Sequence, residues 1–384
     1  MKQLYILTLF VLILISCKSP SDKEHYVIQK SEKILSFQLN RDVKMPYYVF
    51  PFEEKGCQYL SFQNSIQSEI LIYEMYSGKL IKQMRIETEG SNAVIGGFSG
   101  YFIQSMNQIF VPSLYVNTIW VMDTTAVIKQ KIDYSKTKTG QLLTPFIPND
   151  KSQMAFINDS INIPLGLNMM LKEKVVENSF VSAVIDTVNK NVVALPMKFP
   201  QLMTDKDLHT VASSGCDYSR CYDGKDFIYS FHYDEFLYKA NSNHHKVDKI
   251  IGKSKYIDHV DLFRSNDSDF RKMLKAQCEH ATYGNILYDK YRNVYYRFVY
   301  PSVNVDDFKG DYINLIRSGG KNFSIIILDK NLTIIGETLF PDYTYNSKLA
   351  FVLKDGLYIS LNHIQNPNYS DDVLSFQRFE LKEK

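Results

Sequence analysis

Short runs of β-forming residues, separated by turn residues, recur along almost the whole chain and constrain its fold more than any other feature. Residues 69–73 read Glu-Ile-Leu-Ile-Tyr, residues 77–79 form a Ser-Gly-Lys turn, and residues 80–86 alternate between apolar and polar side chains. Such alternation is typical of a strand with one buried face. Comparable groups of three or four runs occupy residues 59–86, 108–132, 154–195, 226–250, 293–337 and 349–381.

These units predict an all-β chain folded as a six-bladed β-propeller. A small sheet cannot bury both faces alone, but sheets arranged radially cover one another. Each unit has roughly 60 residues, more than the ~40–50 of a compact blade, so long loops are expected. The last unit shows three clear strands, and we expect residues 34–39 to supply the fourth and close the ring. Seven blades, or paired β-sandwiches, are the alternative architectures.

One stretch departs from the strand pattern. Between Ser268 and Glu279, the apolar residues Phe270, Met273 and Leu274 recur at helical spacing. Ser268 can cap this helix, with Asp269 in its first turn. The helix either packs against the fifth blade or forms a lid over one mouth of the ring.

The first residues indicate export and lipid anchoring. An apolar run over residues 4–15 follows Lys2 and has the length of a signal-peptide core rather than of a membrane span. It ends in Leu-Ile-Ser-Cys at residues 14–17, which resembles the bacterial lipobox. We therefore predict cleavage before Cys17 and attachment of fatty acyl chains such as palmitate to that cysteine.

The sequence predicts three segments of the chain and a cellular location. Residues 1–16 are the predicted signal peptide, residues 17–30 are the lipidated cysteine with a flexible tether, and residues 31–384 form the propeller. The expected location is the cell envelope, with the lipid in the outer membrane and the leaflet left open.

Charge and cysteine content narrow the possible partners and cofactors. The chain has 44 Lys and Arg against 42 Asp and Glu, with no basic cluster, which argues against a nucleic-acid partner. Cys216 and Cys221 are close enough in sequence to form a disulfide in an oxidising compartment, with two free buried thiols as the alternative. Paired CxxC motifs with histidines nearby are missing, so we expect no metal site, and no motif calls for a cofactor.

Candidate site residues lie where predicted strands begin or end, because propeller sites form where loops meet a mouth of the channel. His232, Tyr233 and Asp234 lie between two predicted strands. They combine an imidazole, a phenol and a carboxylate, which an enzyme could use for acid–base chemistry. The simpler interpretation is a polar β-turn.

A second group of candidates lies around later strands. Arg292, Arg297 and Tyr300 surround the run at residues 293–299, and an Arg that faces the channel could bind a carboxylate bidentately. A structural salt bridge between blades is the alternative for these arginines. His363 follows a predicted inner strand and could line the mouth, or could be an ordinary loop histidine.

The mature chain resembles the six-bladed β-propeller lipoproteins of Bacteroidetes-type bacteria, a family known as a domain of unknown function. The resemblance rests on the lipobox and on the strings at residues 59–62, 70–73, 77–79, 288–297, 326–329 and 355–360. It implies a propeller and an envelope location, and it brings no functional residues.

The sequence favours a membrane-anchored, non-catalytic binding or scaffold module for a protein, peptide or glycan. No nucleophile elbow, zinc-protease motif or phosphate loop is present in the sequence. The alternative is a secreted glycan hydrolase or lyase, which would need facing carboxylates, or an acid with His, Tyr or Arg, across the mouth.

Overall fold

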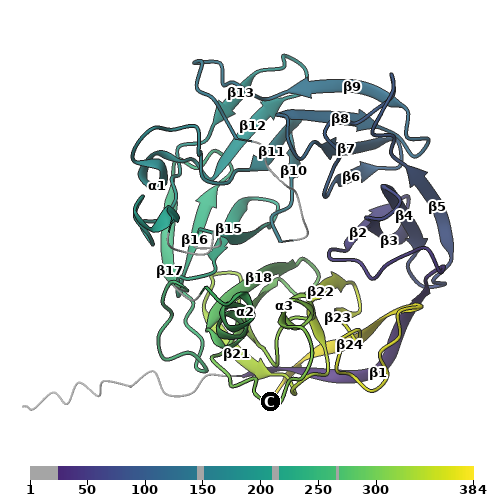
Figure 1. Cartoon of the computed structure of the whole chain (residues 1–384), viewed down its shortest axis with the longest axis vertical. Coiled ribbons are helices and arrows are strands. Elements are labelled where there is room, and N and C mark those ends of the chain that lie inside the picture. Colours follow the sequence, from purple (N-terminus) through teal and green to yellow (C-terminus); the bar gives the residue numbers. More distant parts are fainter. Residues whose placement is uncertain (1–24, 145–150, 210–215, 265–267) are drawn as a thin grey trace, which may run out of the picture.

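The protein is described here by a computed structural model that covers residues 25–144, 151–209, 216–264 and 268–384. Six antiparallel sheets of four strands stand around a central axis (Figure 1), which confirms the six-bladed β-propeller. Each sheet is one blade, and its innermost strand pairs with a single neighbour in that sheet. Neither a seventh blade nor a pair of stacked sandwiches forms among the described residues.

The blades follow one another along the chain, and each is given from its innermost strand outward. Blades one to three comprise β2 (Phe50–Glu54), β3 (Cys57–Asn64), β4 (Glu69–Glu74), β5 (Leu80–Arg85); β6 (Phe102–Ser105), β7 (Gln108–Pro112), β8 (Thr118–Met122), β9 (Ile128–Asp133); and β10 (Ala155–Ile157), β11 (Ser160–Pro164), β12 (Ser182–Asp186), β13 (Val192–Ala194). Blades four to six comprise β14 (Tyr218–Tyr222), β15 (Asp226–Phe231), β16 (Phe236–Asn241), β17 (Val247–Ile251); β18 (Thr282–Asp289), β19 (Val294–Tyr300), β20 (Ser324–Leu328), β21 (Ile334–Leu339); and β22 (Asn346–Leu353), β23 (Gly356–Ser360), β24 (Val373–Glu383), β1 (Tyr26–Gln38).

The core is divided among the interfaces between neighbouring blades. Between blades six and one, the ring of Phe37 packs edge-on against Tyr73 and Phe376, with ring centres 5.7 and 6.1 Å apart. Similar buried clusters lie at the other interfaces around the ring. Burying one large apolar side chain contributes ~1.5–3 kcal/mol. The apolar faces of the blades therefore stabilise the ring only when neighbouring blades meet.

The first and last strands close the ring, as the sequence predicts. β1 pairs antiparallel with β24, from Tyr26 opposite Glu383 to Gln38 opposite Val373. Figure 1 shows the purple β1 beside the yellow β24. β1 begins at Tyr26, ahead of the residues 34–39 that the sequence predicts for this strand.

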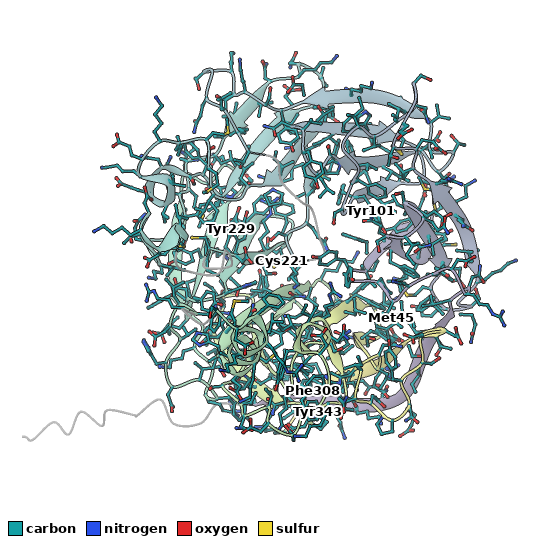
Figure 2. All side chains as sticks on the ribbon, viewed as in Figure 1. Met45, Tyr101, Cys221, Tyr229, Phe308 and Tyr343 are labelled. Atoms are coloured by element: carbon teal, nitrogen blue, oxygen red, sulfur yellow. The ribbon has the colours of Figure 1, made fainter. Side chains whose placement is uncertain are left out.

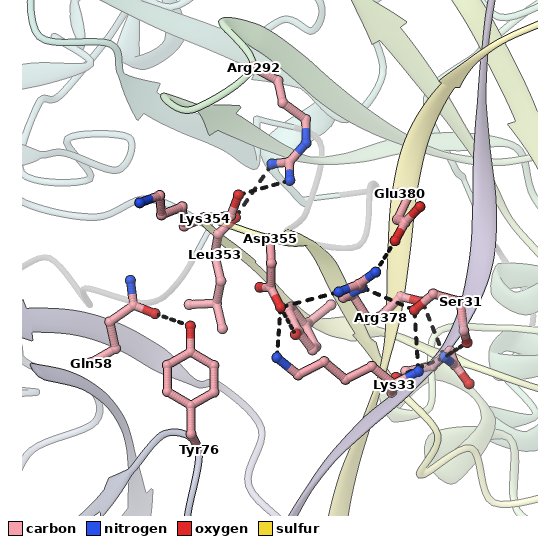
Figure 3. A network of polar contacts seen from close by, with 12 residues as sticks. Ser31, Lys33, Gln58, Tyr76, Arg292, Leu353, Lys354, Asp355, Arg378 and Glu380 are labelled. Carbon is pink, nitrogen blue, oxygen red and sulfur yellow. Dashed lines mark hydrogen bonds and ion pairs between the residues drawn. The ribbon is translucent and has the colours of Figure 1, made fainter.

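Polar side chains reinforce this closure (Figure 3). The ammonium group of Lys33 lies 2.7 Å from a carboxylate oxygen of Asp355, and Arg378 contacts the same carboxylate at 3.4 Å. Arg378 also donates from Nε to the hydroxyl of Ser31 and pairs with Glu380. The cluster links β1, β24 and the turn between β22 and β23.

The predicted helix is present as α2 (Phe270–Glu279), but its N-cap is Asp269 rather than Ser268. The carboxylate of Asp269 accepts hydrogen bonds from the backbone N–H groups of Arg271 and Lys272, which a helix otherwise leaves unpaired. α2 packs through Leu274 on α3 (Tyr312–Arg317). α3 lies in the connection between strands β19 and β20 of blade five. This agrees with the interpretation that α2 packs against the fifth blade. The other short helical segments are α1 (Val175–Asn178), α3 (Tyr312–Arg317) and a 3-10 turn (Asp207–His209).

Candidate functional site

A cavity of about 450 Å³ lies on the axis of the ring. Its volume falls within the range of ~300–1,000 Å³ that is typical of ligand pockets. Every blade contributes to its wall, chiefly through the innermost strand, and Figure 2 shows Cys221 of β14 near the centre of the ring. The residues in its wall include Phe52, Glu53, Gln58, Gln104, Arg220, Tyr222, Lys290, Tyr291 and Phe351.

The innermost strands line the cavity with polar backbone groups as well as with side chains. Each of these strands pairs within its sheet along one edge, and the other edge faces the axis. Backbone N–H and C=O groups on such an edge must bond to water, side chains or a ligand. The cavity can therefore offer both donors and acceptors to a bound molecule.

One end of the cavity concentrates polar side chains near the turns that follow the innermost strands. Gln58 of β3 donates from Nε2 to the hydroxyl of Tyr291, at 3.4 Å. The hydroxyl of Tyr76 in turn donates to Oε1 of Gln58, at 2.9 Å (Figure 3). Glu53 lies directly opposite Gln58 in the β2–β3 ladder, and Lys290 precedes Tyr291 in the chain. A bridge from blade one to blade five thus has a charged residue beside each of its ends.

Aromatic rings in the wall are held rigidly by neighbouring rings. Phe52 stacks on Tyr59 with ring centres 5.1 Å apart, and Phe351 stacks on Tyr358 at 5.4 Å. Tyr222 packs against Phe227 at 4.7 Å. Because these rings are fixed before any ligand arrives, they provide apolar contact surface at a small cost in conformational entropy.

Arg220 supports the wall from behind, and sequence reasoning missed it. Its side chain is buried and donates to the carbonyl oxygens of Gln153 and Asn162 and to the hydroxyl of Ser182. It also donates to the hydroxyl of Tyr229, which contacts Nε2 of His244 at 2.5 Å. Arg220 therefore joins blade three to blade four and leaves little of its hydrogen-bonding capacity for a ligand.

Arg297 has a structural role and does not line the cavity. Its guanidinium is fully buried and donates to the carbonyl oxygens of Asp234, Glu235 and Gly252 and to the hydroxyl of Ser230. Burial lowers the pKa of Arg297 to about 10, and it remains a cation at neutral pH. The partners are mainly carbonyl groups, so Arg297 holds the β15–β16 turn of blade four against blade five without the salt bridge considered from sequence.

His232, Tyr233 and Asp234, which lie in the β15–β16 turn, do not converge on one point. The carboxylate of Asp234 accepts from the backbone N–H of Phe236 and from the hydroxyl of Tyr238, which is the pattern of a polar turn. Tyr233 is buried, with its ring 5.8 Å from that of His280. His232 keeps a buried Nε2 without a hydrogen-bond partner among the described residues.

The electrostatic surroundings of His232 also argue against a proton-transfer role at neutral pH. Burial lowers its pKa well below the ordinary value, and the positive charges of Lys151, Lys348 and Arg297 lower the pKa further. The imidazole is therefore neutral at neutral pH, and no described carboxylate of the β15–β16 turn bonds to its Nε2.

The other candidates are dispersed. Arg292 pairs with Asp289 at 2.8 Å and donates to the carbonyl of Lys354 (Figure 3), which links the turn of blade five to that of blade six. The hydroxyl of Ser347 donates a hydrogen bond to the hydroxyl of Tyr300. The ammonium of Lys348 lies over the ring of Tyr300, 4.1 Å from the ring centre. Arg292 therefore forms its salt bridge within blade five, and its link to blade six is a hydrogen bond to a backbone carbonyl rather than the salt bridge between blades considered from sequence.

His363 is a buried loop residue, which agrees with the simpler interpretation. It bonds through Nε2 to the carbonyl of Gly320 at 2.9 Å and accepts at Nδ1 from the backbone N–H of Gln365. Both ring nitrogens are thus used by the backbone.

The cysteines are separate thiols, so the disulfide considered for Cys216 and Cys221 is not formed. Cys216 packs into the core between blades three and four, whereas Cys221 packs against the core between blades four and five. Burial raises the pKa of Cys216 to about 12, which keeps its thiol protonated and unreactive. Cys17, the predicted lipidation site, lies outside the described residues.

The described part of the chain contains neither a metal-binding cluster nor a membrane-spanning helix. No three His, Cys, Asp or Glu side chains gather there into a set that could hold a metal ion. No helix there is long and apolar enough to span a bilayer.

Six radial sheets around an axial cavity define a six-bladed β-propeller, closed by a strand from each end of the chain. The chain belongs to the DUF4221 family, described as a domain of unknown function, whose profile matches residues 23–339. This confirms the resemblance noted from the sequence.

Solved structures agree with this assignment. A DUF4221 member from Bacteroides vulgatus superimposes with a TM-score of 0.81 and 23% identity, over 94% of this chain and 100% of its own. A Bacteroides fragilis protein, named as a candidate exported protein, gives a TM-score of 0.55 and 12% identity, over 94% of this chain and 96% of its own. At these identities the two structures show the shared fold. No curated protein matches the chain in sequence.

Proposed function

We propose that this protein is a lipid-anchored binding module of the cell envelope, which holds a small ligand, peptide or glycan in the axial cavity. The cavity itself carries the proposal: it is pocket-sized, reaches every blade, and combines fixed aromatic rings with amide side chains and strand edges. Such a mixture of apolar wall and few polar groups is what ligand sites share.

The composition of the cavity wall favours binding over glycan hydrolysis. Hydrolases generally need two carboxyl groups, about 5–9.5 Å apart, on either side of the scissile bond. Among the described residues that line the cavity, Glu53 is the single carboxylate. His232, Arg297 and His363, the residues considered as partners for an acid, are engaged or enclosed elsewhere in the fold.

Export and anchoring are supported by the sequence at residues 1–17 and by a structural relative. The lipobox-like ending at Cys17 predicts acylation, and the Bacteroides fragilis relative carries a name that refers to export. We place the anchor in the outer membrane of the envelope.

The binding proposal can be tested with a variant that fills the cavity. Gln104 is exposed, lines the cavity and lies on β6, so Gln104→Trp adds an indole there at small cost to the core. Gln29→Trp on the outer strand β1 is the matched control, because Gln29 is also an exposed strand glutamine. A panel of short peptides and neutral oligosaccharides is then screened by thermal shift.

We expect at least one compound to raise the melting temperature of the wild type and of Gln29→Trp, and to lose its effect on Gln104→Trp. If every compound that stabilises the wild type also stabilises Gln104→Trp equally, the ligand does not occupy the axial cavity and the proposal is wrong.

A further inference from the structure

Two opposite charges line the axial cavity without an ion-pair partner in the described part of the chain. Glu53 comes from blade one and Lys290 from the β18–β19 turn of blade five. Both side chains are exposed. The ammonium of Lys290 has one described contact, the ring of Tyr291, at 5.1 Å from the ring centre.

The bridge between Gln58 and Tyr291 places these charges near each other. Glu53 is the direct ladder partner of Gln58, and Lys290 is the chain neighbour of Tyr291. The amide of Gln58 and the hydroxyl of Tyr291 are 3.4 Å apart. Glu53 and Lys290 therefore belong to the same end of the cavity, each beside one end of the bridge.

This arrangement discriminates among ligands by charge. Complementary charges on a protein and its ligand favour the matching partner and disfavour others. A ligand with one cationic and one anionic group can pair with both Glu53 and Lys290. A neutral glycan leaves both charges unused, and a dianion or dication meets repulsion from one of them.

We propose that the cavity binds a short zwitterionic peptide, whose ammonium group pairs with Glu53 and whose carboxylate pairs with Lys290. The proposal rests on the binding function proposed above and specifies its ligand class. The aromatic side chains of Phe52, Tyr222 and Phe351 supply apolar surface for the body of the peptide. Backbone groups on the inner strand edges can bond to its amides.

Titration calorimetry with defined peptides tests this proposal. The probes are Ala-Leu, Ala-Leu-Ala and Ala-Gln-Ala with free ends, and the same peptides acetylated at the amino end, amidated at the carboxyl end, or both. The proteins are the wild type, Glu53→Gln and Lys290→Gln. Glu32→Gln and Lys330→Gln, which change exposed residues away from the cavity, are the matched controls.

The expected pattern assigns each end of the peptide. At least one free peptide binds the wild type and both controls, and blocking either end weakens binding at least tenfold. In Glu53→Gln, acetylation no longer matters while amidation still does, and in Lys290→Gln the dependence is reversed.

Two results would show that the ligand is not a zwitterionic peptide. They differ from the result that would show that the ligand does not bind in the cavity. The class is wrong if free and doubly blocked peptides bind equally, or if no free peptide binds at millimolar concentration. If a neutral oligosaccharide then binds the wild type but not Gln104→Trp, the cavity is a binding site for a different class. Peptide binding that survives Gln104→Trp contradicts the cavity proposal instead.

Discussion

Gly336 of β21 lies against the backbone carbonyl of Tyr26, so closely that a Cβ atom on Gly336 would be 2.1 Å from the oxygen. Nearby, the hydroxyl oxygen of Thr338 accepts from the backbone N–H of Ile28. The first strand is thus fixed both to β24 in its own blade and to the outer strand of blade five.

Gly336→Ala should destabilise the propeller by about 1–3 kcal/mol, because the obstructing atom belongs to the backbone and cannot rotate away. Gly166→Ala is the control, since nothing lies within 4 Å of its added Cβ. Urea unfolding of both variants measures the effect. An equal free energy of unfolding for the two would show that β1 can shift without cost.

The buried pair of Tyr229 and His244 predicts acid sensitivity. Burial lowers the pKa of His244 to about 4 from its usual 6.5. Below pH 6.5 the unfolded chain binds a proton that the folded protein does not accept until about pH 4. The contribution of His244 to the free energy of unfolding therefore has its full value above pH 6.5. This contribution falls as the pH drops towards 4, by about 2 kcal/mol between pH 7 and pH 5.

His244→Asn should remove that part of the pH dependence, and Asn tolerates the left-handed backbone at this position, where φ is 58°. His245→Asn, at the exposed neighbour, should keep the wild-type dependence. Urea unfolding at pH 7 and pH 5 compares them. The same loss of stability in all three proteins would assign the acid sensitivity to other groups.

Arg297→Met should cost about 3–5 kcal/mol, because it leaves the buried carbonyls of Asp234, Glu235 and Gly252 without their donor. Arg297→Lys should recover only part of this loss, since an ammonium cannot reproduce the planar fork of the guanidinium. Arg85→Met, at an exposed Arg, is the control. Near-equal stability of Arg297→Met and Arg85→Met in denaturant titration would refute the structural role.

Cys17→Ala should abolish lipid attachment and release the protein from membranes. In detergent phase partition, the wild type should enter the detergent phase and the variant the aqueous phase, and labelled palmitate should be incorporated only into the wild type. Cys57→Ala, at an exposed cysteine of β3, is the control and should behave as the wild type. Palmitate in the Cys17→Ala protein would place the lipid elsewhere.

The blade number and the ring closure could be predicted from sequence because the two middle strands of most blades carry apolar runs and the outermost strands alternate. β20 (Ser324–Leu328) is wholly buried and reads Ser-Ile-Ile-Ile-Leu, whereas the innermost strand β14 reads Tyr-Ser-Arg-Cys-Tyr. Innermost strands border the axial cavity along one edge and need no regular alternation, so the sequence pattern does not reveal several of them.

The candidate site was predicted poorly for a related physical reason. His232, Arg297 and His363 attract attention as chemically versatile residues, yet their groups are largely enclosed or bonded to the backbone. Glu53 and Lys290 read as ordinary solvated residues, because only closure of the ring brings blades one and five to the same cavity. Their position near the end of an inner strand, or directly after one, was the available clue.

The pairing of β1 with β24 has a consequence for how the protein is made. Ser31 and Arg378, which are bonded across that ladder, are 347 positions apart in the chain. A nascent chain cannot complete the circle until its final strand has left the ribosome, and contacts so distant in sequence form slowly. An exported chain would therefore remain open, and able to thread through a narrow translocation pore, until β24 has been synthesised.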